Sequence, residues 1–137
     1  MDLELEGKEG VTLDQLRWIH RHKTGALLKV ACTAGALLGG ASADDVKRME
    51  AFSDSIGLAF QVADDILDVT QSTEQLGKTA GKDEAVSKTT YVKLMGLEGA
   101  KAEAKRLVDE ARRALEPYKD RAAPLRAIAD YIIEREN

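Results

Sequence analysis

Three aspartates, Asp64, Asp65 and Asp68, form the run DDILD inside an otherwise apolar stretch of the chain. Residues three and four apart share one side of a helix, so we expect these carboxylates to lie together, with Gln61 one turn earlier. The surrounding segment, 55–69, is apolar almost all round, which is typical of a buried helix lining an internal cavity. The acids have no basic neighbour in sequence and need protons, cationic side chains or a metal. Hard oxygen ligands favour Mg²⁺ or Mn²⁺.

Basic residues flank the acidic run in both directions along the sequence. Lys23 lies in the segment His-Arg-His-Lys-Thr, and Lys78 and Lys82 follow the acids in a polar segment. A carboxylate cluster alone would bind divalent ions loosely, but a diphosphate can bridge those ions while lysines neutralise its outer oxygens. Such a site stabilises a diphosphate leaving group as charge develops on it. Taken singly, each of these lysines is more often a solvated surface charge.

Phe60 and Gln61 directly precede the acids and suit a reaction in which a diphosphate leaves by ionisation. The carbocation that remains would be shielded from water by apolar walls, oriented amide oxygens and aromatic faces. The plainer alternative is that DDxxD is a common pattern on solvated helices; the apolar context favours the functional interpretation. His20 and His22 are two residues apart and on different helix faces, so we interpret them as exposed or capping histidines.

Length and composition predict one helical domain spanning residues 1–137. Hydrophobic residues make up 44% and charged residues 32%, with only two prolines, which favours a soluble, largely helical protein. The net charge of -4 argues against nucleic acid as a partner. The single cysteine, Cys32, excludes an internal disulfide and is interpreted as a buried structural thiol. The apolar run 26–40 is too short to span a membrane, and we expect a cytoplasmic location.

The periodicity of apolar residues predicts the helices that position these groups. Thr12 and Gln15 form a capping box, and Gly39-Gly40 ends the helix that they begin. Ser42 caps the next helix, which carries DDILD near its end. The segment 70–90 is polar and without helical periodicity. The expected helices are 13–38, 43–69, a short one at 90–95, 100–115 ended by Pro117, and a last one from Pro124 with Leu125, Ile128, Tyr131 and Ile132 on one apolar face.

Three stretches in order resemble the trans-type isoprenyl diphosphate synthases, the family of farnesyl and geranylgeranyl diphosphate synthases. They are Ile19–Leu28, Gly57–Asp68 and Leu76–Asp83. The resemblance implies an all-α fold, the C-terminal half of an isoprenoid-synthase-type helical bundle. It also implies a prenyltransferase of isoprenoid biosynthesis, which condenses isopentenyl diphosphate with an allylic diphosphate through Mg²⁺-assisted ionisation. Terpene cyclases share this fold and the ionisation chemistry, but Lys23-Thr24 and DDILD resemble the synthases better.

The resemblance assigns roles to individual residues of this sequence. Metal ions bridged to the allylic diphosphate would be bound principally by Asp64, supported by Asp65 and Asp68. The remaining roles concern the substrates: Lys23 and Lys78 would grip the diphosphate, Thr24 and Gln61 would face the allylic cation, and Phe60 would lie beside the isopentenyl diphosphate pocket.

The part of the family pattern that carries the first aspartate-rich motif has no counterpart in this chain, which therefore resembles a partial domain lacking the N-terminal half. We expect the isolated chain to have little or no turnover. We also expect its first two helices to leave apolar faces uncovered, so that it aggregates, forms a homodimer or associates with a complete synthase subunit. One alternative is a non-catalytic partner that binds metal and diphosphate beside a complete synthase. Another is a helical fragment that retains the motif without using it.

Overall fold

The computed structural model describes the backbone of residues 10–76 and 89–135, and the side chains of residues 10–71 and 89–135. Every regular element in these ranges is helical. The fold is therefore all-α, as the sequence predicts.

The helix expected at 13–38 is a single rod of three consecutive pieces. These are α2 (Leu13–His20), a π-helical turn η1 (Arg21–Gly25) and α3 (Ala26–Leu38). The capping box is present: the Thr12 side-chain oxygen accepts a hydrogen bond from the Gln15 N–H, and the Gln15 side chain accepts one from the Thr12 N–H. The rod ends at Gly39, and Gly40 then adopts a φ of +75°, which suits glycine.

Helix α4 (Ala43–Leu76) is longer than the sequence predicts. It begins as expected at Ser42, whose hydroxyl accepts a hydrogen bond from the Asp45 N–H at 3.2 Å. The expectation that it ends near residue 69 was wrong, since helix continues through Leu76. The Thr70 hydroxyl donates to the Ile66 carbonyl at 3.1 Å, so its polar group is satisfied within the helix. The helix therefore continues through a polar segment in which no apolar periodicity predicts it.

The chain returns through α5 (Tyr91–Ala114), which joins the two segments predicted separately at 90–95 and 100–115. Gly96 lies between them with a φ of +73° and bends the backbone. A 3-10 segment, η2 (Glu116–Ala122), contains Pro117 and leads into α6 (Ala123–Glu134), whose first turn contains Pro124. Both prolines stand at helix starts, where the missing N–H costs nothing.

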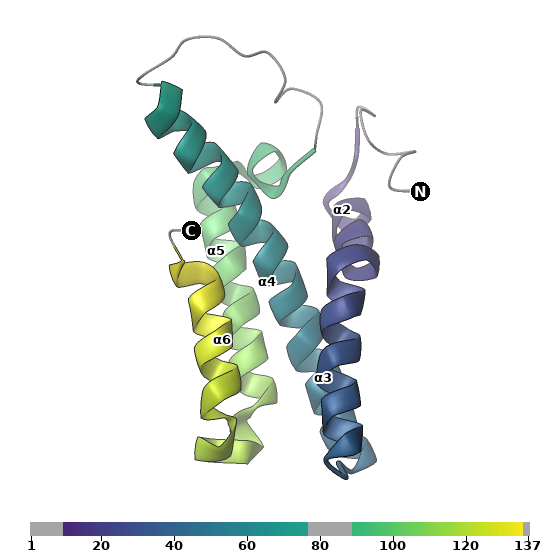
Figure 1. The fold of residues 1–137 in the computed structure, drawn as a ribbon. Coiled ribbons are helices and arrows are strands. Elements are labelled where there is room, and N and C mark those ends of the chain that lie inside the picture. The colour runs from purple at the N-terminus through teal and green to yellow at the C-terminus, as the bar shows by residue number, and fades with distance from the viewer. Residues whose placement is uncertain (1–9, 77–88, 136–137) are drawn as a thin grey trace.

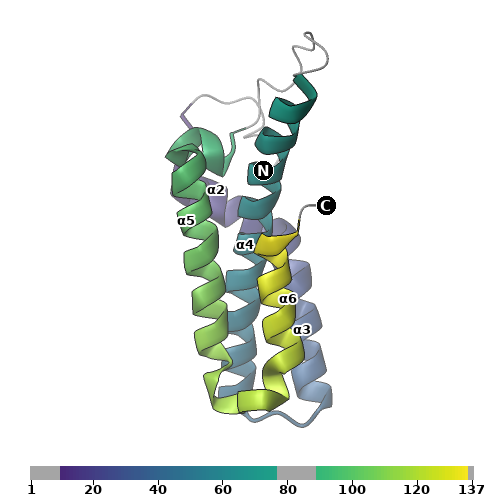
Figure 2. The same cartoon turned by 90° about the vertical axis from the view of Figure 1, so that its left-hand side faces the viewer.

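Helices α4 and α5 form the centre of the bundle. Helix α6 packs against both of them, and α3 packs against α4 (Figures 1 and 2). The core between them is apolar, and its largest fully buried side chains are Phe52, Val62, Tyr91, Val108 and Leu115. The DDILD helix is thus the element that the others contact.

The outer face of α3 is apolar and open to solvent. No residue of α3 is buried, and Leu27, Val30, Leu37 and Leu38 are 61–91% exposed. The expectation of an uncovered face is confirmed for this first rod but was wrong for the second helix, α4, which contributes more buried core residues than any other helix described. Cys32 is only half-buried, and desolvation raises the pKa of its thiol, which disfavours the reactive thiolate.

The apolar face predicted for α6 differs from the one that is buried. Ala129 and Ile132 pack into the core, whereas Ile128 and Tyr131 are 51% and 63% exposed. Spacings of three and four residues allow two neighbouring stripes on a helix with so many apolar residues, and packing against α4 and α5 decides between them.

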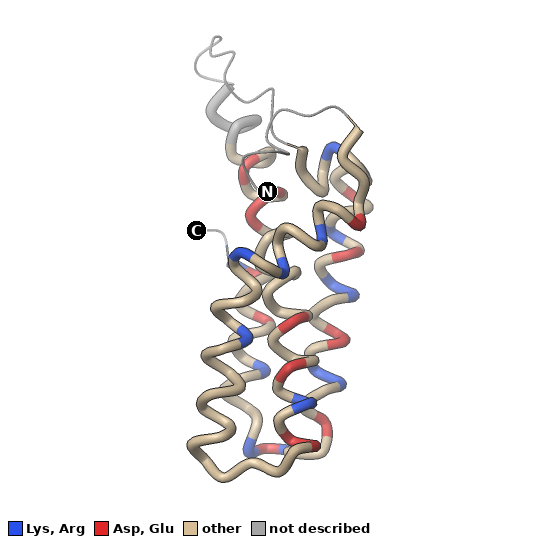
Figure 3. Tube along the Cα trace, turned by 90° about the vertical axis from the view of Figure 1, so that its right-hand side faces the viewer, with Lys and Arg blue, Asp and Glu red and all other residues tan. Residues whose placement is uncertain are grey.

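Figure 3 shows positions of Lys and Arg interspersed with positions of Asp and Glu along the described helices. None of the helices in the described ranges is both long and apolar enough to cross a membrane.

Candidate functional site

Two glycines bring the π-helical turn η1 against α4. A Cβ atom placed on Gly57 would lie 3.0 Å from the Cα of Gly25, tighter than nine in ten real Cβ contacts. A Cβ on Gly25 would lie 3.1 Å from the His20 carbonyl oxygen. The segment that carries Lys23 and Thr24 therefore contacts α4 at Gly57, one turn before Gln61. In this segment Lys23 is exposed and Thr24 is half-buried. π-Helical turns are rare and frequently lie at functional sites.

A buried carboxylate fixes the rod that carries this turn. Glu103 of α5 is 7% exposed and accepts hydrogen bonds from Arg17 at 2.8 Å and from Arg106 at 2.7 Å. The hydrogen bond from Arg106, together with the smaller effect of Arg17, lowers the pKa of Glu103 to about 2 against the opposing effect of burial. Because Arg17 belongs to α2, this ion pair joins α2 to α5 just before the π turn begins.

On α4, the acidic run divides between two environments. Asp64 keeps 40% of its side chain exposed, and Asp68 is exposed. Gln61 is half-buried, and its amide nitrogen lies 3.5 Å from Asp64 Oδ2, the limit of a hydrogen bond. The expectation of carboxylates in an internal cavity was wrong for Asp68, which is exposed, and Asp64 is only half-buried.

Asp65 points elsewhere. It is 3% exposed and accepts a hydrogen bond from the Tyr91 N–H at 2.8 Å, at the first residue of α5. The positive end of the α5 dipole stabilises a carboxylate at this position. The expectation that the three acids share one side was therefore wrong for Asp65. A helix places residues 64 and 65 about 100° apart, and the helix N-terminus beside α4 engages only one of them.

Tyr91 and His20 form a buried layer beneath Asp65. Their rings stack with centroids 5.7 Å apart, and both side chains are buried. Burial raises the pKa of the Tyr91 hydroxyl to about 12. The interpretation of His20 as an exposed or capping histidine was wrong, whereas His22 is exposed and its Nδ1 lies 2.7 Å from the Trp18 carbonyl oxygen. This layer joins α2 to the start of α5 beside Asp65.

Arg135 supplies a cation to the acidic run from the end of α6. Its guanidinium forms an ion pair with Asp64 and lies over the ring of Phe60, with Cζ 4.2 Å from the ring centroid. Arg135 is 71 residues away from Asp64 in sequence but adjacent in space. It is a cationic side chain, one of the partners that the sequence predicts for these acids.

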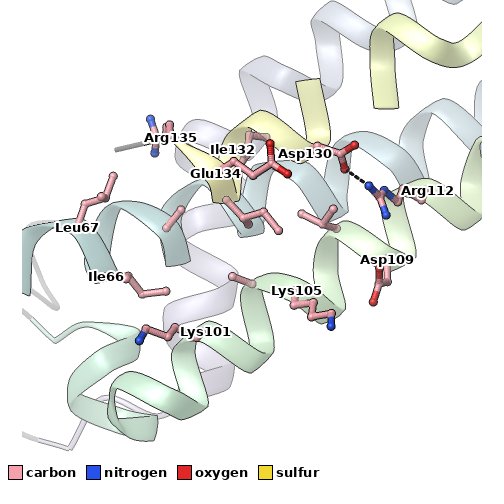
Figure 4. Close-up of a pocket in the computed structure, with 14 residues that line it drawn as sticks. Ile66, Leu67, Lys101, Lys105, Asp109, Arg112, Asp130, Ile132, Glu134 and Arg135 are labelled. Carbon is pink, nitrogen blue, oxygen red and sulfur yellow. Dashed lines mark ion pairs between the residues drawn. The ribbon is translucent and has the colours of Figure 1, made fainter. Parts of the chain in front are cut away.

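A cavity of about 470 Å³ lies between α4, α5 and α6 (Figure 4). Figure 4 shows Lys101 and Lys105 on its α5 side, with Glu134 and Arg135 on its α6 side. Its charges are largely compensated inside the protein, since Arg112 pairs with Asp130 at 2.6 Å and Lys101 with Glu98 at 2.9 Å. Apart from Arg135, it contains none of the groups discussed above. Lys78 and Lys82 lie outside the described residues.

The family model described as Polyprenyl synthetase matches residues 1–127 of this chain. The chain belongs to the polyprenyl synthetase family. The resemblance stated from its three sequence stretches is thereby confirmed, as is its assignment to the all-α fold of these enzymes.

The chain is similar to several named synthases. The chain is 53% identical to a chloroplastic geranylgeranyl pyrophosphate synthase of Capsicum annuum over 137 residues, covering 99% of this chain and 37% of that protein. It is 49% identical to the large subunit 1 of a heterodimeric, chloroplastic geranylgeranyl pyrophosphate synthase of Arabidopsis thaliana, covering 100% of this chain and 38% of that protein. The chain thus spans less than half the length of these polyprenyl synthetase relatives.

A solved structure of the same family resembles this one. It is a geranyltransferase of Helicobacter pylori in complex with magnesium and isoprenyl diphosphate, with a TM-score of 0.65 and 35% identity. The match covers 90% of this chain and 40% of that one. The polyprenyl synthetase fold in this region is therefore common to both proteins.

The sequence does not predict the contact between Arg135 and the acidic run. The position of Arg135 three residues after the buried Ile132 places it on the inner side of α6, and this spacing was the available signal. The contact itself depends on how α6 packs along α4, which periodicity does not encode.

Proposed function

We propose that this chain supplies the second metal-binding and diphosphate-binding half of an isoprenyl diphosphate synthase active site. The observation that carries the proposal is the Gly25–Gly57 contact, because it joins the Lys23-Thr24 turn to the helix that carries Gln61 and Asp64. The presence of magnesium and isoprenyl diphosphate in the Helicobacter pylori relative supports it.

The oxygen donors on α4 suit Mg²⁺ that is also bound by water and by the substrate. Among the described residues there is no group of three His, Cys, Asp or Glu side chains that could hold a metal ion. Asp64 and Asp68 nevertheless offer two carboxylates four residues apart, and Mg²⁺ is commonly bound by one or two carboxylates together with water and substrate phosphates. We propose Asp64 and Asp68 as the ligands and Asp65 as the residue that positions α5 beside them. When bound, the metal would neutralise charge on the diphosphate leaving group.

The remaining side chains suit ionisation of an allylic diphosphate. Lys23 and Lys78 would hold the outer phosphate oxygens as the carbon–oxygen bond breaks. Because the Gln61 amide nitrogen faces Asp64, its amide oxygen is left to face the developing cation, with Thr24 beside it. Attack by the double bond of isopentenyl diphosphate and loss of a proton would complete a head-to-tail condensation.

Turnover tests the catalytic part of this proposal. We expect the purified chain with Mg²⁺, isopentenyl diphosphate and an allylic diphosphate to release no measurable diphosphate, because the first aspartate-rich motif is not part of this sequence. Addition of an N-terminal half taken from a relative should restore turnover, and Asp64→Asn should abolish it. Restoration that persists in Asp64→Asn would contradict the role of Asp64.

A second candidate is a non-catalytic subunit that associates with a complete synthase. The exposed apolar face of α3 favours it, and one relative is a subunit of a heterodimeric enzyme. Co-expression with a complete synthase tests it. This candidate is favoured over complementation if the two chains co-elute and this chain changes the turnover of the complete synthase. The Asp64→Asn variant should then change that turnover to the same extent as the wild type.

A further inference from the structure

Arg135 engages the carboxylate at which the proposed metal would bind. Its guanidinium pairs with Oδ1 of Asp64. The other carboxylate oxygen, Oδ2, lies 3.5 Å from the amide nitrogen of Gln61. Both oxygens of Asp64 therefore face hydrogen-bond donors of the chain itself. A metal ion at this carboxylate would meet the positive charge of Arg135.

Arg135 is held in this position from two sides. The guanidinium lies over the Phe60 ring at 4.2 Å, and the side chain is only 18% exposed. A desolvated guanidinium over an aromatic ring is attracted to it, and the ion pair with Asp64 adds to this attraction. Phe60 and Asp64 are four residues apart on α4, so a single face of that helix binds the guanidinium.

The contact is also one that can be released. Arg135 is the first residue after α6, with an extended backbone (φ -64°, ψ 133°). Its Nε is buried and has no hydrogen-bond partner among the described residues, so the bound position leaves one donor unsatisfied. The backbone N–H of Arg135 donates to the Tyr131 carbonyl oxygen, and rotation of the Arg135 side chain leaves this hydrogen bond in place.

We propose that Arg135 occupies the cation position at Asp64 in the metal-free protein and competes with Mg²⁺ for that carboxylate. This inference rests on the proposed function, since it needs a metal at Asp64. Arg135 then opposes loading of the metal–diphosphate complex at Asp64, which couples the end of α6 to the state of the site. By linkage, the ion pair lowers the apparent affinity for Mg²⁺, and the metal weakens the ion pair by the same factor.

Calorimetric titration of Mg²⁺ in the presence of inorganic pyrophosphate tests the competition on the full chain. We expect Arg135→Gln to bind about three- to fivefold more tightly than the wild type, the range for loss of a partly exposed ion pair. Arg112→Gln is the matched control, because it removes a guanidinium that pairs with Asp130 instead. It should bind as the wild type does.

Two outcomes separate this inference from the proposed function. If Asp64→Asn weakens binding but Arg135→Gln and the wild type agree within about twofold, the competition is refuted while the metal site stands. If Asp64→Asn binds as the wild type does, the metal is not at Asp64 and both proposals fail.

A second measurement covers the case in which Arg135→Gln does not fold. The side-chain Nε–H resonance of Arg135 in the ¹⁵N-labelled wild type should shift on addition of Mg²⁺ with pyrophosphate. A resonance that stays in place while calorimetry records binding would overturn the inference.

Discussion

Gly25 and Gly57 lie in direct backbone contact, so that a Cβ atom on Gly57 would come within 3.0 Å of the Cα of Gly25. No larger residue fits at this crossing without moving the π turn away from α4. The crossing stands one turn before Gln61 and beside Thr24, and it therefore sets the separation between the two halves of the candidate site.

Substitution of Gly57 by alanine should separate the two elements. The new methyl group meets backbone rather than a flexible side chain, and we expect Gly57→Ala to lower the free energy of unfolding by about 1–3 kcal/mol in urea titrations. Gly35 is the matched control in α3, since a Cβ there would meet nothing within 4 Å. Gly35→Ala should instead stabilise the chain by up to about 1 kcal/mol through helix propensity. Equal effects of the two substitutions would contradict the crossing.

Asp65 should behave as a structural carboxylate. Asp65→Ala leaves the buried Tyr91 N–H without its acceptor, and we expect a loss of about 1–3 kcal/mol of stability together with faster hydrogen exchange at that amide. Asp65→Asn keeps an acceptor oxygen and should cost less. If Asp65→Asn weakened Mg²⁺–pyrophosphate binding as strongly as Asp64→Asn, Asp65 would be a ligand after all.

Glu103 should make stability depend on pH in the acidic range. Its folded pKa of about 2 lies below the ordinary value of 4.5, so the folded state releases the proton more readily than the unfolded state. The stabilisation is fully present above about pH 4.5 and is lost as the pH falls toward 2. Urea titrations between about pH 1.5 and about pH 7 span both pKa values and measure it.

Glu103→Gln should flatten this pH dependence and lower stability near neutral pH by about 1–3 kcal/mol, because it uncouples Arg17 from α5. Glu98→Gln is the control, since its ion pair with Lys101 is on the surface and should contribute less than about 1 kcal/mol. An unchanged acid profile in Glu103→Gln would show that another carboxylate is responsible.

The apolar face of α3 should mediate association. Leu27 and Val30 are 75% and 62% exposed on this face, and burial of such side chains against another chain is favourable. We expect the wild type to associate in a concentration-dependent manner by light scattering and Leu27→Glu/Val30→Glu to remain smaller at the same concentration. Ile128→Glu, on the separate exposed face of α6, should leave association unchanged.

Local signals explain the parts of this protein that the sequence predicts well. Two helix starts are set by hydrogen bonds between neighbouring residues, Thr12 with Gln15 and Ser42 with Asp45. One helix end is set by the dihedral preference of Gly39-Gly40. These boundaries therefore need no tertiary information. The continuation of α4 through Leu76 escaped prediction because the segment after residue 69 is polar and shows no apolar periodicity.

The sequence by itself determined the all-α fold, the family and the nature of the acidic run, because spacing along a helix and residue type are local properties. Only the tertiary structure decided that Asp65 accepts a hydrogen bond from the first residue of α5 and that Asp64 forms an ion pair with Arg135. Both outcomes depend on which helix ends lie beside α4. Those positions follow from packing between segments distant in sequence, where the Gly25–Gly57 contact and the burial of Ile132 set the geometry.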